Sequence, residues 1–219
     1  MALLGAEVEL ARRAPQLPDE PLALDGRIGS GPPVRQVVWL GDSTAAGVGA
    51  SGPDAALPRL VAADLPGTVE LTVLAVSGAR IGDVVDEQLP LVEDADLVFV
   101  SAGANDVTHL TRLSDVRSRY RRLLAGLPGD VVVLGVPDMG SIPRLLQPLR
   151  AITGWRGRAV DDAVRDVAEE AGATYVDIAG ETGPAFRDDP GRLFAGDDYH
   201  PSDDGYRLWA DAVAARMGS

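Results

Sequence analysis

Five short runs of apolar residues recur along the chain from residue 34 onward. Most of them are continuous and rich in β-branched side chains, which is typical of parallel strands covered on both faces. Because a strand exposed on one face would instead alternate apolar and polar residues, we expect a buried sheet. The predicted strands are 34–40, 69–76, 95–102, 130–136 and 173–178.

The segments between these strands have the patterns of helices. We expect helices near 54–64, 83–92, 111–126 and 155–172, and a last one at 203–216. The last helix has a clear start signal, because Ser202 can cap its free amides and two acids follow at the positive end of the helix dipole. Strands that alternate with helices predict a doubly wound α/β sheet, in which ligands bind beyond the carboxyl ends of the strands.

Residues 1–33 differ from the rest of the chain. Residues 3–13 predict a short amphipathic helix, and the Pro-rich stretch after them predicts an extended connector, so that residues 34–219 form the main domain. Glu7 and Glu9 precede the arginines and the apolar run is short, an order opposite to that of a signal peptide. No run reaches the roughly 18 apolar residues of a membrane span. We expect a cytoplasmic protein by default, with an exported or membrane-anchored longer form as the alternative.

Composition narrows the possible partners. The 219 residues suit one large domain, and a hydrophobic content of 46% is enough for a single core. The formal net charge of -13 predicts repulsion of nucleic acid and of anionic membranes. The chain has no cysteine, which excludes disulfides, thiolate metal sites and a cysteine nucleophile. Composition thus excludes several kinds of site, and the loops at the carboxyl ends of the strands are where a ligand is expected to bind.

The loop after the first predicted strand, GDSTAAGVGASG at 41–52, surrounds one acid and one hydroxyl with small residues. The glycines of 47–52 have the G-x-G-x-x-G spacing of a dinucleotide site, but six residues separate Leu40 from the first of them. A phosphate-binding loop of the NTPase type needs a lysine, and the chain has none. Nucleotide binding by 47–52 is therefore the alternative, and nucleophilic attack by Ser43 is the main hypothesis.

A nucleophilic serine needs a base, an acid that orients the base, and donors for an oxyanion. The chain has two histidines. Asp197 precedes His200 by three residues, so a single turn can bring its carboxylate to the imidazole. Asp198 is the rival acid, and spacing alone does not exclude it. His109 has only Asp106 close before it, which makes it the weaker candidate base.

Oxyanion donors can come from two other strand ends. Gly78 follows the second predicted strand, where its amide can point into a site without a side chain of its own in the way. Asn105 follows the third, where its side-chain amide can donate. Each is an ordinary turn residue when taken alone. Ser43, Gly78 and Asn105, however, follow three consecutive strands at the edge where an α/β sheet builds its site.

Four short motifs resemble, in order, the signature blocks of the SGNH hydrolases, the GDSL-type esterases and lipases. They are GDST with Ser43, VSGAR with Gly78, GAND with Asn105, and DDYH with Asp197 and His200. The resemblance implies a flavodoxin-like, three-layer α/β/α fold with a five-stranded parallel sheet in the order 2-1-3-4-5. It also implies a serine esterase that acts through an acyl-enzyme without a metal or cofactor.

The resemblance assigns roles residue by residue. It makes Ser43 the nucleophile, His200 its base and Asp197 the acid that orients the base. The Ser43 amide, the Gly78 amide and the Asn105 side chain form the oxyanion hole. The implied substrates are small-molecule esters with short to medium acyl chains, either lipid or acetylated sugar esters. A noncatalytic binding module of the same fold is the second alternative.

Several neighbouring residues need separate interpretations. Thr44 stands where the name-giving pattern has leucine, which puts a lipase-type acyl preference in doubt. Asp42 is expected to shape the turn rather than to take part in catalysis. The acids Asp197, Asp198, Asp203 and Asp204 form a candidate cation site, but most have another role as helix-start charges or as partner of the base, so no metal is expected.

Two segments near the predicted site carry more apolar residues than solvated loops need. The first, PDMGSIPRLLQPLRAITGWRGR at 137–158, either walls an acyl pocket, forms a mobile lid, or packs as an ordinary helix. The second, at 182–200, carries Phe186 and Phe194 and is expected to form another rim of the mouth.

Overall fold

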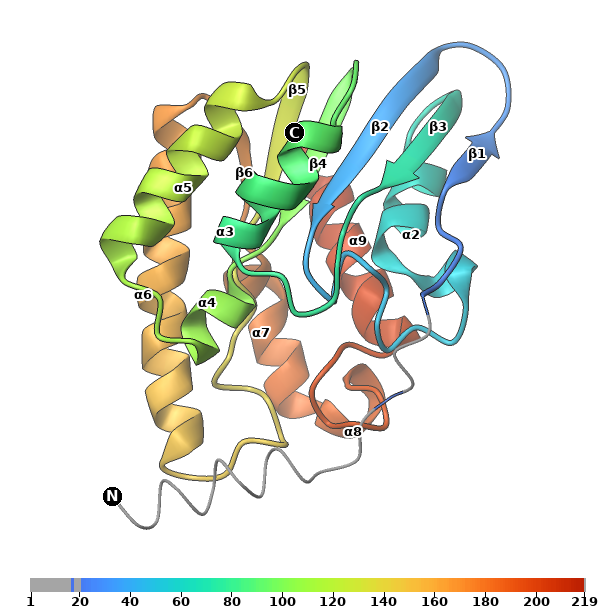
Figure 1. The fold of residues 1–219 in the computed structure, drawn as a ribbon. Coiled ribbons are helices and arrows are strands. Elements are labelled where there is room, and N and C mark those ends of the chain that lie inside the picture. Colours follow the sequence, from blue (N-terminus) through green and yellow to red (C-terminus); the bar gives the residue numbers. More distant parts are fainter. Residues whose placement is uncertain (1–16, 18–20, 219) are drawn as a thin grey trace.

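The centre of the molecule is a six-stranded sheet in the order β1-β3-β2-β4-β5-β6 (Figure 1). The structure, a computed structural model, describes residues 17 and 21–218. Strands β2 to β6 are parallel, whereas β1 pairs antiparallel with β3. The strands are β1 (Gly26–Gly29), β2 (Val34–Gly41), β3 (Thr68–Val73), β4 (Leu97–Ser101), β5 (Asp130–Leu134) and β6 (Thr174–Val176).

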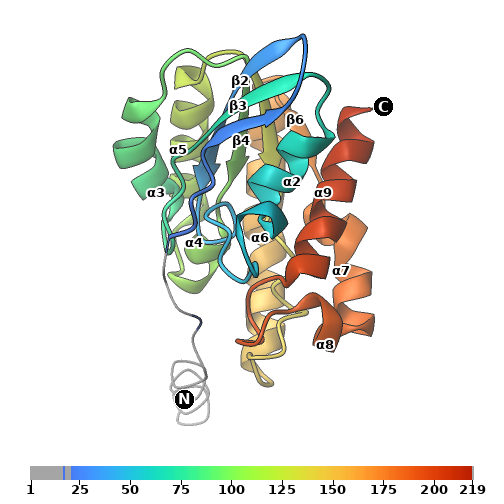
Figure 2. The same ribbon diagram turned by 90° about the vertical axis from the view of Figure 1, so that its right-hand side faces the viewer.

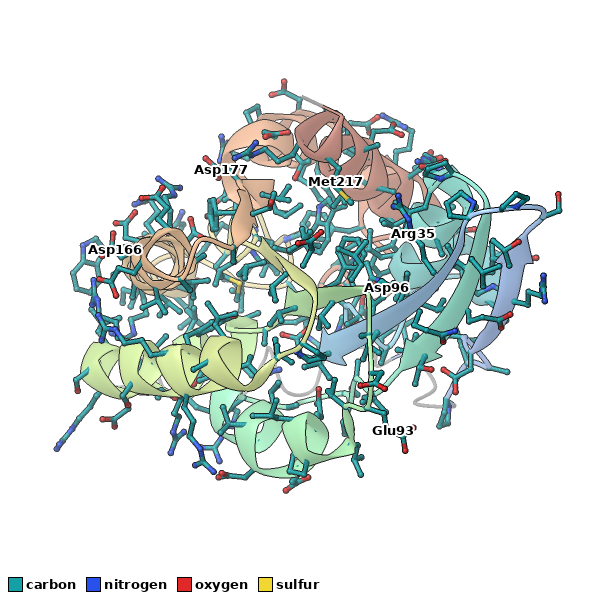
Figure 3. All side chains as sticks on the ribbon, turned by 90° about the horizontal axis from the view of Figure 1, so that it is seen from above. Arg35, Glu93, Asp96, Asp166, Asp177 and Met217 are labelled. Atoms are coloured by element: carbon teal, nitrogen blue, oxygen red, sulfur yellow. The ribbon has the colours of Figure 1, made fainter. Side chains whose placement is uncertain are left out.

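Helices cover both faces of the sheet, as the end-on view shows (Figure 3). On one side α2 contacts α9, and α9 contacts α7; on the other side α3 contacts α5, which lies beside α6 (Figure 2). No helix in the described residues is long and apolar enough to cross a membrane. The helical elements are η1 (Pro53–Ala55), α2 (Leu57–Asp64), α3 (Ile81–Asp83), η2 (Val84–Gln88), η3 (Leu89–Leu91), α4 (Ala104–Thr108), α5 (Leu113–Gly126), α6 (Leu149–Glu170), α7 (Ile178–Asp188), α8 (Pro190–Leu193) and α9 (Asp203–Met217).

The predicted α/β fold is confirmed, and each of the five predicted strands is present. The expectation of a five-stranded, wholly parallel sheet is wrong, because β1 adds a sixth strand at the edge. This strand lies in the stretch that we predicted to be an extended connector. Its sequence, Gly-Arg-Ile-Gly, offers a single apolar side chain, and an edge strand half exposed to water needs no more. The predicted helix at 3–13 lies outside the described residues.

All five predicted helices are present, although one begins earlier than expected and one is irregular. Three further helices were not predicted. Helix α6 begins at Leu149 rather than at 155, so the segment 137–158 is half loop and half helix. The predicted helix at 83–92 is a succession of α, π and 3-10 turns. Helices α4, α7 and α8 were not predicted, since two are very short and α7 contains Pro184 and two glycines.

The core is anchored by two aromatic rings on neighbouring central strands. Trp39 on β2 is paired in register with Phe99 on β4, and their rings stack with centroids 4.5 Å apart. Both side chains are fully buried. The indole N–H of Trp39 finds no hydrogen-bond partner among the described residues, which is a cost to the folded state.

We predict that Trp39→Ala lowers the free energy of unfolding by about 3–5 kcal/mol, because it leaves a cavity beside Phe99. Trp39→Phe should cost much less, since it keeps a ring in the stack and removes an unpaired donor whose burial costs about 1–3 kcal/mol. Urea unfolding followed by circular dichroism measures both variants. Equal losses for the two substitutions would contradict this account of the core.

Candidate active site

Ser43 lies in a tight turn directly after β2. Gly41 has a φ of 152°, and a Cβ on it would lie 2.1 Å from the carbonyl oxygen of Ser101. Only glycine fits at this position, where the chain leaves the sheet. The buried carboxylate of Asp42 accepts hydrogen bonds from the amide of Thr44 at 3.1 Å and from its hydroxyl at 2.9 Å. These bonds hold the turn, and Ser43 lines the cavity described below. The structural role predicted for Asp42 agrees with this geometry.

The imidazole of His200 lies between Ser43 and Asp197. Its Nε2 is 3.0 Å from the Ser43 Oγ, and its Nδ1 is 2.6 Å from Asp197 Oδ2. The other carboxylate oxygen of Asp197 accepts the backbone amides of Tyr199 and His200 at 3.1 and 3.0 Å. Asp198, the rival acid, is exposed, and its backbone carbonyl accepts a hydrogen bond from the amide of Arg144. The structure therefore brings Asp197 to the imidazole.

The hydrogen bonds to Asp197 also keep it ionised. Its side chain is 3% exposed, and burial alone would raise its pKa. The bonds from the His200 ring and from the two backbone amides outweigh this effect and hold the pKa below its usual value. A carboxylate that stays charged beside Nδ1 favours a proton on that nitrogen, which leaves Nε2 free to accept the proton of Ser43.

Three contacts hold the Ser43 loop against the segment that carries His200. Ser51 donates its amide and its hydroxyl to the carboxylate of Asp203, at 2.7 and 2.5 Å. The Tyr206 hydroxyl donates to the carbonyl of Val48. Asp203 and Tyr206 lie in the first turn of α9, just beyond His200. These contacts align two segments whose key residues are 157 positions apart in the chain.

Of the glycines in 47–52, Gly49 serves the same contact, and Gly47 packs elsewhere. Gly49 has a φ of 100°, and a Cβ on it would lie 2.3 Å from the carbonyl oxygen of Pro201 and 3.1 Å from the Cβ of His200. Gly47, with a φ of 78°, is similarly close to Ala56. Gly52 precedes only the three-residue 3-10 turn η1, and the α-helix that follows, α2, begins at Leu57. Close packing of the chain on itself accounts for Gly47 and Gly49, two of the three glycines in the spacing that suggested a nucleotide.

The residues expected to donate to an oxyanion lie on two adjacent turns. Asn105, in the first turn of α4, lines the cavity described below and donates one amide hydrogen to the carbonyl of Ala79 at 3.1 Å. A side-chain amide has a second hydrogen to offer. Gly78 is exposed, has a φ of 81° and precedes Ala79, so the bond ties its turn to α4. His109 is exposed at the end of α4 and bonds through Nδ1 to the carbonyl of Asn105.

A cavity that is partly open to solvent begins at Ser43 and His200. Its wall is largely apolar. The apolar and aromatic side chains that line it include Met139, Ile142, Phe186, Phe194 and Trp209. The first two come from the loop before α6 and the next two from 182–200, so both predicted segments contribute to the wall. Trp209 was not predicted, because its place on an amphipathic helix also suits a residue of the core.

Several polar groups of this cavity have protein partners, although the indole N–H of Trp209 has none among the described residues. The Ser141 hydroxyl donates to the carbonyl of Asp138 at 2.7 Å, and the Thr182 hydroxyl donates to the carbonyl of Ile178 at 2.6 Å. The Asp138 carboxylate pairs with Arg187. The inner cavity therefore offers mainly apolar surface to a ligand.

The acids considered as a cation site do not form one cluster. Asp197 bonds to His200, Asp203 to Ser51, and Asp204 to Arg192 at 3.2 Å. Across the residues that the structure describes, no group of three or more acids and histidines is placed to bind a metal ion.

Comparison with known proteins gives a family match over most of the chain. Residues 39–208 match the GDSL-like Lipase/Acylhydrolase family. The chain is 33% identical over 189 residues to the GDSL-like esterase Rv1075c of Mycobacterium tuberculosis, an alignment that covers 80% of this chain. The chain matches 59% of the length of that relative.

Solved structures share the fold at lower identity. Phospholipase A1 from Streptomyces albidoflavus has a TM-score of 0.68 and 21% identity, over 83% of this chain and 99% of that one. A mutant of an acetyl-xylooligosaccharide esterase from Geobacillus stearmophilus has a TM-score of 0.61 and 21% identity, over 87% of this chain and 96% of that one. At these identities the likeness concerns the fold.

The buried Asp42 predicts a dependence of stability on pH. Burial raises the pKa of Asp42 from 3.8 to about 6, against the lowering effect of the bonds from Thr44. The folded protein therefore holds this proton more tightly than the unfolded chain does, and the associated stability is lost as the pH rises from about 4 through 6. The loss amounts to about 3 kcal/mol at neutral pH.

Asp42→Asn removes this titration while keeping an oxygen that can accept from Thr44. The wild type should lose about 3 kcal/mol of stability between pH 4 and pH 7.5, and the variant should not. The free energy of unfolding of the variant minus that of the wild type should therefore rise by about 3 kcal/mol over this range. Urea unfolding at a series of pH values measures it. A difference that stays constant over this range would contradict the proposed burial of the charge.

Proposed function

The chain belongs to the GDSL-like lipase/acylhydrolase family, and from this premise we propose that it is a serine hydrolase of carboxylic esters. The observation that carries the proposal is the continuous hydrogen-bonded series from Ser43 through His200 to the buried Asp197. The series lies at the mouth of an apolar cavity, where a bound ester can present its carbonyl carbon to the serine oxygen.

In the proposed reaction His200 acts first as a base and then as an acid. Its Nε2 takes the proton of Ser43 as the Oγ attacks the ester carbonyl, and Asp197 stabilises the resulting imidazolium. The imidazolium then gives this proton to the leaving alcohol, which leaves an acyl group on Ser43. A water molecule, deprotonated by His200, attacks the acyl carbon, and Ser43 regains its proton as the acid departs.

We further propose that three donors stabilise the negative oxygen of the tetrahedral intermediate. They are the amides of Ser43 and Gly78 and the second amide hydrogen of Asn105. The bond from Asn105 to Ala79 supports this role, because it fixes the side chain before any substrate binds. Donors that are fixed in advance need no reorganisation during the reaction, and each contributes about 2.7–4 kcal/mol to transition-state stabilisation.

The lining of the cavity favours the acyl part of a lipid ester over an acetylated sugar. Phe186, Phe194 and Trp209 present apolar surface near the serine. The hydroxyls of Ser141 and Thr182 are engaged with backbone carbonyls, so these two groups are not free to recognise a sugar ring. We propose that the acyl chain, of short to medium length, enters this cavity and that the alcohol part lies toward solvent.

We expect the protein to hydrolyse p-nitrophenyl esters, with a maximum of kcat/KM between butyrate and octanoate in a series from acetate to palmitate. Ser43→Ala and His200→Ala should each lower kcat by about 10⁴-fold or more, because the serine and its base act as a unit. Release of p-nitrophenol measures the rates. Undiminished activity in Ser43→Ala would show that Ser43 is not the nucleophile, and a maximum at palmitate would contradict the proposed acyl length.

Asn105→Ala should lower kcat by about 10²–10³-fold and leave KM nearly unchanged, because the lost hydrogen bond forms only in the transition state. His109→Ala, on the same short helix but exposed, is the matched control and should retain the rate. Thermal unfolding of Asn105→Ala checks that the lost bond to Ala79 has not disordered the site. An effect on KM alone, in a folded variant, would rule out the oxyanion role.

A further inference from the structure

Gln88 is a buried polar residue on the inner side of an irregular helix. Its side chain is 2% exposed, and η2 turns it inward together with Val84 and Val85 while Asp86 and Glu87 face solvent. Glutamine is mostly found at protein surfaces, because burial of its amide costs free energy unless the amide is hydrogen-bonded. A glutamine at this position therefore indicates specific bonding partners.

Both polar atoms of the Gln88 side chain bond to the backbone of one residue, Gly41. The N–H of Gly41 donates to Oε1 at 2.9 Å, and Nε2 donates to the carbonyl of Gly41, also at 2.9 Å. Gly41 is the last residue of β2, and Ser43 lies two positions after it. The glutamine amide is thus attached to the backbone at the point where the chain leaves the sheet for the proposed nucleophile.

Gln88 takes the place of a strand neighbour at the end of β2. On one side of this end the ladder with β4 continues, because the N–H of Asp42 donates to the carbonyl of Ser101 at 3.0 Å. On the other side β3 has already ended, and the chain beyond it bonds to Gly41 through the N–H of Val76 at 3.1 Å. The Oε1 of Gln88 accepts the N–H of Gly41 in the place of a carbonyl that a longer β3 would offer.

Gly41 links the two backbone arms of the proposed oxyanion hole. Ser43, which would contribute one amide, lies two residues after Gly41. Gly78, which would contribute the other, lies two residues after Val76, whose N–H bonds to the carbonyl of Gly41. Gln88 bonds to this same carbonyl. A displacement of Gly41 would therefore move the two arms relative to each other, although both amides must point at one oxygen atom.

We propose that Gln88 is a positioning residue for catalysis, which holds the end of β2 so that Ser43 and the backbone donors keep their places. The inference rests on the proposed esterase function and adds to it a residue that lies in none of the four sequence motifs. Gln88 is not among the described residues that line the cavity, so it acts through Gly41. Its loss should therefore lower the rate of reaction rather than the binding of substrate.

Gln88→Leu tests the proposal, because leucine is of similar size and forms neither hydrogen bond. We expect kcat for p-nitrophenyl butyrate to fall by about 10–100-fold, since a displacement of about 1 Å at a reacting group has an effect of this order. KM should stay within about twofold of the wild-type value, because the cavity wall is unchanged. Circular dichroism confirms the folded state at the temperature of the assay.

Thr68→Val is the matched control for a general loss of stability. Thr68 is fully buried at the start of β3, at the opposite end of the sheet from Ser43, and its hydroxyl donates to the carbonyl of Gly31 at 2.7 Å. This substitution also removes a buried bond from a side chain to the backbone, so it should lower Tm while kcat is retained. An equal fall of kcat in the two variants would overturn the positioning role.

Gln88→Glu provides a second test, which also decides the matter if the leucine variant does not fold. A neutral carboxylic acid offers one donor and one acceptor, as the glutamine amide does, whereas a carboxylate only accepts. Burial raises the pKa of such a carboxyl, so its neutral form persists toward neutral pH. The ratio of the variant kcat to the wild-type kcat should therefore rise about fivefold or more as the pH falls from about 9 to about 6. The ionisations of His200 and Asp42 occur in both proteins and largely cancel in this ratio.

Two results would overturn the proposal and leave the esterase function intact. The first is a folded Gln88→Leu variant with the kcat of wild type. The second is a ratio for Gln88→Glu that does not change with pH. A wild-type protein whose ester hydrolysis is absent, or is unaffected by Ser43→Ala, would instead overturn the proposed function and the role of Gln88 with it.

Discussion

The geometry of the site depends on close contact between the loop after β2 and the segment that leads into α9. Ser43 and His200 belong to different ends of the chain, and no strand or helix contains both. Gly49 lets the two backbones approach, while the Asp203 carboxylate and the Tyr206 hydroxyl fasten the loop to the start of α9. A distance of 3.0 Å between Oγ and Nε2 is the product of this packing. Gly49, the middle glycine of the nucleotide-like spacing, is part of the same contact.

Two carboxylates on either side of this contact have opposite electrostatic environments. Asp197 receives hydrogen bonds from His200 and Tyr199 that more than offset its burial, so its pKa is lowered and its charge is available to the imidazole. Asp42 receives fewer bonds and its pKa rises to about 6. Burial destabilises both charges. The hydrogen bonds outweigh burial at Asp197, whereas burial outweighs them at Asp42, which therefore takes up a proton below about pH 6. Burying Asp42 therefore lowers the stability of the folded protein at neutral pH, while its hydrogen bonds to Thr44 hold the turn that carries Ser43.

Much of this arrangement could be predicted from sequence because it depends on local signals. Continuous apolar runs predicted the five parallel strands, and short motifs at their carboxyl ends predicted a family that the comparison confirms. The edge strand β1 was missed because Gly26–Gly29 carries one apolar side chain. Trp209 was missed because its contact with the cavity depends on how α9 packs on α7, and pairing of Asp197 rather than Asp198 with His200 depends on a turn that spacing alone leaves open.

Covalent labelling with an organophosphonate tests the central claim most directly, because the reagent reacts with a serine only where a base activates it. Intact mass spectrometry of the full chain, followed by peptide mapping, measures the number and position of the adducts. The account predicts one adduct, on Ser43, and none in Ser43→Ala at the same protein concentration. Labelling of another serine, or no adduct on the folded protein, would contradict it and would favour a noncatalytic binding module of the same fold.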